Sequence, residues 1–257
     1  ARARGIDLEA VAGSGARGRV RMADLLGSGR RVPLRGAARV MAERMAHAHR
    51  VVPQVTVVVE VNVARLEACV AGDAGATPPA SLLGLICLGA IRGLAADPLL
   101  NSSFDDTALE LVLHEQVELG IAVQTSDALR VATIPGADRL FPRDFQARLD
   151  QAVAAARAGT LTPAQMTGST FTVSSGGKLG GLLATPIVNW PNVAILGVHA
   201  IQDRPLVEDG QVVAGRAANL SLSFDHRVVD GMRASRFLYG LQASLQQPEA
   251  LLEPAGD

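Results

Sequence analysis

The chain has 257 residues, 48% of them hydrophobic, with 24 Lys and Arg against 25 Asp and Glu and a formal net charge of -1 at pH 7. This length can bury one large core beside a small appendage, and the balanced charge argues against nucleic acid as the main partner. No apolar run reaches the roughly 18 residues of a membrane span, and the Arg-rich start lacks the apolar segment of a signal peptide. Two cysteines, Cys69 and Cys87, are too few for a disulfide framework and indicate buried free thiols in a reducing cytosol.

The first 26 residues form a small unit. Ile6–Val11 predicts one helical turn, Gly13–Gly18 a loop and Met22–Leu26 a second short helix. The loop has the spacing G-x-G-x-x-G, but no strand precedes it and no acidic residue follows about 20 positions on, so a dinucleotide site is not expected. Three arginines are candidate contacts for an acidic partner, unless they form only a solvated basic loop: Arg17, Arg19 and Arg21.

A linker and a large domain follow. Gly27–Arg31 has the Gly and Ser composition of a linker, and the large domain, residues 32–257, begins after it. Gly36–His49 predicts an amphipathic helix, because small and apolar residues recur on one face. His47 and His49 are two positions apart and lie on different faces of this helix, so they cannot chelate one metal together.

The next elements are a strand and two helices. Gln54–Val63 predicts a strand whose odd-numbered valines, from Val55 to Val63, face the core. Ala64–Val70 predicts a short helix. Pro78-Pro79 opens a long helix to Ala96 that is apolar nearly all round and should be buried on several sides.

Antiparallel strands, a helix and a hairpin are expected in the middle of the chain. The strands are Leu109–Leu113, Val117–Gln124 and Arg130–Ile134, the helix is Arg143–Ala158, and the hairpin is Leu206–Val213, turned at Asp209-Gly210. The sequence spacing around His114 and His199 does not support a functional role for either residue, and we interpret both as structural.

Thr170–Lys178 alternates as a strand that ends in Ser174-Ser175 before a Gly-rich turn. A phosphate-binding loop would need Ser or Thr after the lysine, where the chain has Leu179, and no G-x-S-x-G elbow of a serine hydrolase occurs anywhere. The two hydroxyls could also do no more than satisfy a tight turn.

Ser221–Gly231 is the most informative stretch. It begins as a strand with Leu222 and Phe224 on one face and polar residues on the other, and it ends in a turn before a helix expected at Met232–Gln246. His226 therefore lies at the mouth of a strand. An imidazole ordinarily titrates near pH 6.5, which suits a general base, although a surface or capping histidine is the alternative.

The sequence Asp-His-Arg-Val-Val-Asp-Gly at Asp225–Gly231 resembles the active-site signature of the acyltransferase component of 2-oxo acid dehydrogenase complexes, and its His-x-x-x-Asp-Gly core resembles that of chloramphenicol acetyltransferases. Residues 3–26 resemble the second half of the family's peripheral subunit-binding domain, so residues 1–26 are expected to be a partial copy of it. The resemblance implies an α/β fold of the chloramphenicol-acetyltransferase type. We expect a mixed sheet flanked by helices in a trimeric building block, with the site at the subunit interface.

The resemblance also assigns catalytic roles. His226 would take the proton of the attacking thiol, and Asp230 would orient the loop or the imidazole. Phe171–Ser174 matches the family strand whose last serine donates a hydrogen bond to the oxyanion, so Ser174 receives that role and Ser175 is the near alternative.

Other site assignments concern the channel and a partner for the motif aspartate. Leu196, with Ser175, would line the substrate channel. The family carries a basic pair near positions 38 and 39, where this chain has Ala38-Arg39, and Arg39 is the candidate partner of Asp230. The family also has a histidine where this chain has Gln54. No metal is implied.

The implied function is transfer of an acyl group between dihydrolipoamide and coenzyme A at the core of a 2-oxo acid dehydrogenase complex, with acetyl (as in pyruvate dehydrogenase) or branched-chain groups favoured. A succinyl-transferring member, an acetyltransferase for another small acceptor and a catalytically silent scaffold remain alternatives. Coenzyme A would be a substrate. The lipoyl group would come from a domain outside this chain, because Lys178 lacks the sequence context of a lipoyl attachment site.

The implied partners are further copies of the chain, as trimers in a 24- or 60-subunit core, and the 2-oxo acid dehydrogenase and dihydrolipoamide dehydrogenase components. Leu251 and Leu252 are candidates for contacts between trimers, unless they belong to a frayed terminus. Neither nucleic acid nor membrane is an expected partner. The bacterial cytoplasm is favoured over the mitochondrial matrix.

Overall fold

The computed structural model describes residues 7–26, 32–72, 80–125 and 128–253. The chain divides into two compact units, Ala1–Gly36 and Ala37–Asp257. The linker expected at residues 27–31 lies outside the described residues, as does the Pro78-Pro79 start expected for the long helix.

Short turns build the smaller unit. Met22–Leu26 forms a 3-10 helix, which confirms the short helix predicted there, and Ala16–Gly18 forms a single 3-10 turn within the expected loop. Residues 8–11 form a turn instead of the predicted helical segment. The Asp24 carboxylate accepts a hydrogen bond from the backbone N–H of Ser14 at 2.9 Å and so ties the loop to the 3-10 helix.

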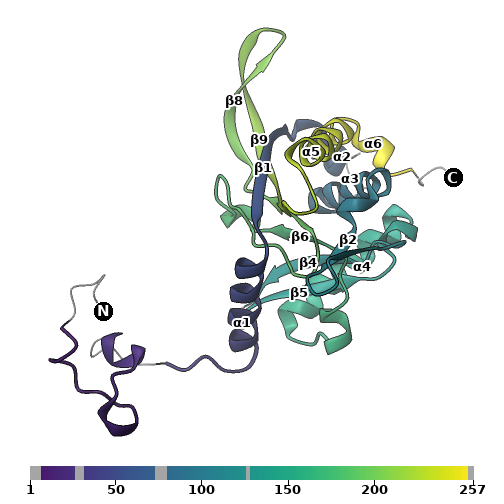
Figure 1. Cartoon of the computed structure of the whole chain (residues 1–257). Coiled ribbons are helices and arrows are strands. Elements are labelled where there is room, and N and C mark those ends of the chain that lie inside the picture. The colour runs from purple at the N-terminus through teal and green to yellow at the C-terminus, as the bar shows by residue number, and fades with distance from the viewer. Residues whose placement is uncertain (1–6, 27–31, 73–79, 126–127, 254–257) are drawn as a thin grey trace. The chain divides into compact units, whose positions relative to one another are not determined.

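A mixed sheet forms the centre of the larger unit (Figure 1). The strand order is β1, β9, β7, β6, β4, β5, and β8 pairs with the first part of β9. The β4–β6 and β6–β7 pairings are parallel and the others are antiparallel. The bounds are β1 Gln54–Asn62, β4 Leu119–Gln124, β5 Leu129–Ile134, β6 Phe171–Ser175, β7 Ala194–Val198, β8 Gln202–Glu208 and β9 Gln211–Asp225.

The expected strands largely occur. β4 and β5 pair antiparallel as predicted. The strand predicted at Leu109–Leu113 is β3 (Glu110–Leu113), which pairs with β2 (Ser102–Asp105) in a separate two-stranded sheet. The predicted hairpin joins β8 to β9 at Asp209-Gly210, where φ is 50° and 76°. β9 continues without a break from the hairpin turn to Asp225, the first residue of the motif, so one long strand connects the two.

Helices α3, α4 and α5 lie on one side of the sheet. α3 and α5 pack against each other, α5 packs on β1 and β9, and α4 packs on β4 and β5 (Figure 1). α3 begins with Ser81 as its N-cap, and it is buried on several sides, as its apolar composition predicts. The bounds are α1 Gly36–Val51, α2 Ala64–Ala71, α3 Leu82–Ala96, α4 Pro142–Ala158, α5 Gly231–Leu245 and α6 Pro248–Leu251.

The two faces of the sheet differ in polarity. Leu220, Leu222 and Phe224 of β9 pack in the core under the helices, as the alternation of the strand predicts. Ser221 and Ser223 point to the opposite face and are nevertheless buried. This polar face is covered by the segment between β6 and β7, residues 176–193, which hydrogen-bonds to β9 side chains.

The valine face of β1 is buried only at one end. Val59, Val61 and Val63 lie in the core, but Val55 remains 38% exposed, contrary to the prediction that the whole face is buried. The reason is that α5 covers only the second half of the strand, around the Gln242 side-chain contact to the Glu60 carbonyl.

Two further observations concern membrane spans and the cysteines. None of the helices in the described ranges is long and apolar enough to cross a membrane. Cys87 is fully buried, and burial raises the pKa of its thiol to about 12, whereas Cys69 is only partly buried.

Candidate active site

His226 is the first residue after β9. Its backbone N–H donates to the Pro53 carbonyl at 3.1 Å, which holds the turn against the start of β1. Its side chain is exposed and its ring lies 5.8 Å from the ring of Phe224. The backbone that carries the imidazole is therefore held at the end of β9, and the side chain is accessible to a reactant, as expected for a general base.

Asp230 closes the turn that follows. Its carboxylate accepts a hydrogen bond from the Arg233 N–H at 2.7 Å and caps the N-terminus of α5. A cap of this kind stabilises the helix and fixes the path of the chain that enters it. The geometry thus gives Asp230 a means of orienting the loop that carries His226.

Arg227 anchors the same loop from its other side. Its guanidinium forms two-pronged hydrogen bonds with Asp225, which is 1% exposed, and lies 4.2 Å from the centre of the Phe104 ring. It also binds Asp106 at 2.5 Å, a residue 121 positions away along the chain. The hydrogen bonds to Asp225, and then those to Asp106, hold the pKa of Arg227 above its ordinary value against the effect of burial.

Asp106 links this anchor to Trp190, whose indole N–H donates to its carboxylate at 2.9 Å. Burial raises the pKa of Asp106, but the hydrogen bonds from Arg227 and Trp190 outweigh it, so the pKa lies below its usual range. The sequence analysis missed Asp106 and Trp190, because neither belongs to a motif and only the fold brings them to Arg227.

Ser174 lies near the end of β6, between Ala122 of β4 and Gly197 of β7. Its side chain is half-buried on the polar face of the sheet, next to Gly197, which has no side chain. The neighbouring Ser175 hydroxyl accepts a hydrogen bond from the Gly177 N–H at 3.3 Å and so supports the Gly-rich turn. Because side chains alternate along a strand, Ser174 rather than Ser175 lies on the polar face, and we expect Ser174 to be the donor to a reactant.

Leu196 and Arg39 lie elsewhere. Leu196 is 0% exposed and packs in the core on the face of the sheet opposite Ser174, since it pairs with Val173 and Leu222. Arg39 lies on α1, where its Nε contacts the Glu43 carboxylate at 2.8 Å on the surface. Within the described ranges no ion pair joins Arg39 to Asp230.

Ser174 and His226 do not meet within one chain. Ser174 pairs with Gly197, which pairs with Ser221. From Ser221, β9 runs on to His226 at the other end of the strands. With a rise of about 3.4 Å per residue and a strand spacing of about 4.8 Å, this register separates the two side chains by roughly 20 Å. A site that uses both residues therefore needs a second copy of the chain.

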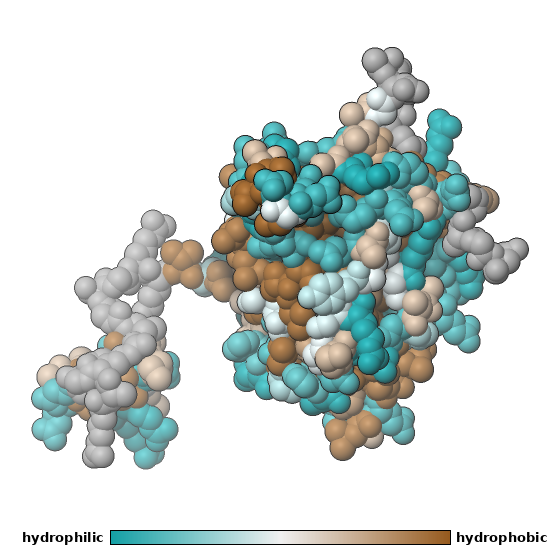
Figure 2. Space-filling model, turned by 90° about the horizontal axis from the view of Figure 1, so that it is seen from above, coloured by the Kyte–Doolittle hydropathy of each residue, from teal (hydrophilic) through white to brown (hydrophobic). Residues whose placement is uncertain are grey.

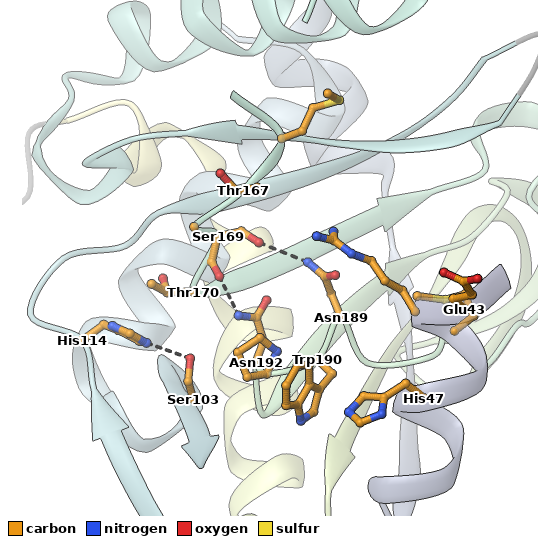
Figure 3. Close-up of a pocket in the computed structure, with 15 residues that line it drawn as sticks. Glu43, His47, Ser103, His114, Thr167, Ser169, Thr170, Asn189, Trp190 and Asn192 are labelled. Atoms are coloured by element: carbon orange, nitrogen blue, oxygen red, sulfur yellow. Dashed lines mark hydrogen bonds between the residues drawn. The ribbon is translucent and has the colours of Figure 1, made fainter. Parts of the chain in front are cut away.

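A cavity of about 630 Å³ lies between α1 and the segments before β6 and β7 (Figure 3). His47 from α1 packs edge-on against Trp190, with 4.6 Å between ring centroids, and His114 Nε2 is hydrogen-bonded to Ser103 Oγ at 2.9 Å. Burial lowers the pKa of His114. The Trp190–Asp106–Arg227 contacts connect the cavity to the motif, and neither Ser174 nor His226 is among its lining residues.

No metal centre is evident in the described part of the chain, where no three His, Cys, Asp or Glu side chains are arranged to hold an ion. The chemistry available from the predicted site residues is proton transfer by an exposed imidazole and hydrogen-bond donation by a hydroxyl. These two groups suit acyl transfer.

Comparison with known sequences gives one family for the larger unit. Residues 27–253 match the model of the 2-oxoacid dehydrogenases acyltransferase (catalytic domain), and residues 1–26 match that of the e3 binding domain. The lipoamide acyltransferase component of the branched-chain alpha-keto acid dehydrogenase complex of Pseudomonas aeruginosa is 35% identical over 277 residues, which cover 98% of this chain and 65% of that protein. The chain thus spans less than two thirds of the length of this relative.

Solved structures share the fold. The dihydrolipoamide acetyltransferase of Azotobacter vinelandii, studied for the roles of a serine, a histidine and an asparagine in its catalytic mechanism, is 33% identical with a TM-score of 0.79 over 88% of this chain and 95% of that chain. The cubic core of a pyruvate dehydrogenase multienzyme complex is 34% identical with a TM-score of 0.78 over 89% and 96%. A chloramphenicol acetyltransferase, 14% identical with a TM-score of 0.51 over 79% and 94%, shares the fold alone. These likenesses confirm the predicted fold class.

Proposed function

The chain belongs to the 2-oxoacid dehydrogenase acyltransferase family, and on that premise we propose that it transfers an acyl group between a dihydrolipoyl thiol and coenzyme A. The observation that carries the proposal is the exposed His226, held at the end of β9 by the Arg227 anchor on one side and the Asp230 cap on the other. An imidazole fixed in this way can accept a proton without first reorganising its loop.

The comparison with the Azotobacter vinelandii enzyme supports the choice of residues. The catalytic serine and histidine studied there are separated along the chain by the same number of residues as Ser174 and His226. Its asparagine follows the histidine at the spacing at which Asp230 follows His226. Asp230 is thus an acidic residue at the position of an amide, which suits orientation of the loop better than proton donation.

In the proposed reaction His226 accepts the proton of the attacking thiol, because a thiol with a pKa of about 8.5 is mostly un-ionised at pH 7. The thiolate attacks the thioester carbonyl, and the Ser174 hydroxyl donates a hydrogen bond to the oxyanion that forms. One such donor contributes about 3 to 4 kcal/mol to transition-state stabilisation. Collapse of the intermediate releases the second thiolate, which takes the proton back from His226.

We propose that a trimer completes the site, with Ser174 of one copy facing His226 of the next. The separation of roughly 20 Å within one chain, from strand rise and spacing, supports such an arrangement, because one chain cannot bring both side chains to one reactant. Large apolar side chains on the surface of the described part support an interface between copies (Figure 2). They include Leu182, Leu183, Val207, Val212, Met232 and Tyr239. Assembly of trimers into a larger core accords with the cubic core among the similar structures.

The smaller unit would bind dihydrolipoamide dehydrogenase, since residues 1–26 match an e3 binding domain. Arg17, Arg19 and Arg21 are exposed and available to an acidic surface. We further propose that the lipoyl group arrives on another domain, that the acyl group is branched-chain or acetyl, and that the protein works in a bacterial cytoplasm. The bacterial branched-chain and acetyl-transferring relatives support the acyl group and the bacterial setting.

Acyl transfer from acetyl-CoA and isobutyryl-CoA to dihydrolipoamide tests the proposal, with chloramphenicol as a rival acceptor and succinyl-CoA as a rival donor. His226→Ala should abolish turnover while light scattering shows unchanged particles. Particles of normal size without any transfer by the wild type would favour a scaffold, and transfer to chloramphenicol alone would favour another acceptor.

A further inference from the structure

The segment that follows Ser174 has little structure of its own. After Ser175 the chain forms a 3-10 turn at Gly177–Leu179, and Gly177 and Gly181 adopt positive φ angles of 55° and 65°. Leu179 is 97% exposed. Because glycine is flexible, this segment needs contacts from elsewhere to fix its path.

The sheet supplies those contacts from its polar face. The Ala200 N–H donates to the Gly181 carbonyl at 3.1 Å. The Asn219 amide donates to the Leu182 carbonyl at 2.8 Å, and the Ser221 hydroxyl donates to the Ala184 carbonyl at 3.1 Å. Residues 180–184 are therefore fastened to the sheet at several successive points, and we call them the anchored loop.

His199 joins two of these anchors. It is 6% exposed, and its Nε2 is hydrogen-bonded to Ser221 Oγ at 2.9 Å. The ring also hydrogen-bonds to the backbone of Gly180, which raises the pKa of His199 by less than burial lowers it. Because Ser221 has a single hydroxyl proton and donates it to Ala184, the neutral imidazole of His199 donates from Nε2 to Ser221 Oγ.

The imidazole of His199 lies over Gly197, the residue next to Ser174 on the neighbouring strand. A Cβ added to Gly197 would come within 2.3 Å of Ser221 Oγ and 3.2 Å of His199 Nε2, so only glycine leaves room for this pair. Gly197 is the strand partner of Ser174, and adjacent strands are about 4.8 Å apart. The His199–Ser221 pair thus fills the space next to the hydroxyl assigned to the oxyanion.

We propose that His199 is a positioning residue, which fastens the anchored loop to β9 and thereby fixes the wall of the site beside Ser174. The inference rests on the proposed acyl transfer. Since Ser174 acts on the oxyanion, a loosened wall should reduce kcat and leave the KM values for both thiol substrates nearly unchanged.

The chain offers a direct probe of the loop. Lys178 is the single lysine in the sequence and lies exposed, two residues before the anchored loop. Endoproteinase Lys-C therefore cuts this chain at one place, and its rate reports local opening of the segment. Assembled His199→Ala should be cut about tenfold faster than the wild type. His199→Gln, whose amide reaches the Ser221 hydroxyl, should recover much of the difference.

The control is His49→Ala, which removes an exposed histidine from α1 and should behave as the wild type in both assays. His199→Ala should lose about tenfold in kcat, with partial recovery in His199→Gln and unchanged particle size and circular dichroism. Wild-type kcat in a variant with faster cleavage would overturn the positioning role, and so would slower turnover without faster cleavage. If the wild type itself transfers no acyl group, the proposed function fails, and the cleavage rates still decide whether His199 fastens the loop.

Discussion

The Arg227 anchor allows one prediction to be worked out in detail. Arg227 has two carboxylate partners that differ in burial: Asp225 is 1% exposed, whereas the side chain of Asp106 is 28% exposed. Arg227→Met keeps most of the side-chain volume and the packing on Phe104 but leaves the Asp225 carboxylate buried without its countercharge. Removal of one partner of a buried ion pair costs about 3 to 5 kcal/mol.

Asp106→Asn is the matched control, because it removes the charge from the more exposed pair and keeps a hydrogen-bonding side chain next to Trp190. Partly exposed pairs are worth about 1 kcal/mol or less. With a urea m-value of about 3 kcal/mol/M, Arg227→Met should lower the unfolding midpoint by about 1 to 1.7 M, against about 0.3 M for Asp106→Asn.

The assay is urea unfolding followed by circular dichroism, at one protein concentration because dissociation of subunits contributes to the midpoint. Equal midpoints for the two variants, or a shift below about 0.5 M for Arg227→Met, would show that Asp225 does not depend on Arg227. Turnover should fall with Arg227→Met as well, since the loop that carries His226 loses its anchor.

Two further predictions concern the hydroxyls and the histidines. Ser174→Ala should lower kcat about 100- to 1,000-fold with little change in KM. Ser175→Ala, which removes the hydrogen bond to the Gly177 turn, should lose less than fivefold. The reverse order would transfer the oxyanion role to Ser175. Burial lowers the pKa values of His114 and His199, so the folded chain binds fewer protons than the unfolded chain below the ordinary pKa of about 6.5. The stabilisation from these two neutral histidines should therefore be complete above about pH 6.5, and the free energy of unfolding should fall on acidification toward pH 5. The fall should be shallower in His199→Gln. Parallel curves for the two proteins would refute the assignment.

Part of the structure follows from local sequence patterns. The alternation in β9 predicts which of its side chains enter the core and which face the polar side, and the structure agrees for Leu222, Phe224, Ser221 and Ser223. Side-chain periodicity of this kind depends only on the geometry of a strand. The motif at Asp225–Gly231 likewise identified the family from a single stretch.

Other features depend on the tertiary structure and could not be predicted from local sequence. Asp106 bonds both Arg227 and Trp190 because the fold brings the end of β2 beside the segment before β7, and nothing in their own neighbourhoods predicts it. The same holds for His199, which spacing alone leaves as a structural histidine. Its contact with the loop after Ser174 depends on the register of β7 with β9.

The sequence by itself determined most of the elements, the inward face of β9 and the two chemical stretches, because these depend on neighbours a few residues apart. The strand order and register decided that Ser174 and His226 lie two strands apart and toward opposite ends of the strands. Strand order is set by contacts between distant segments that bury the common core, and no local pattern encodes it.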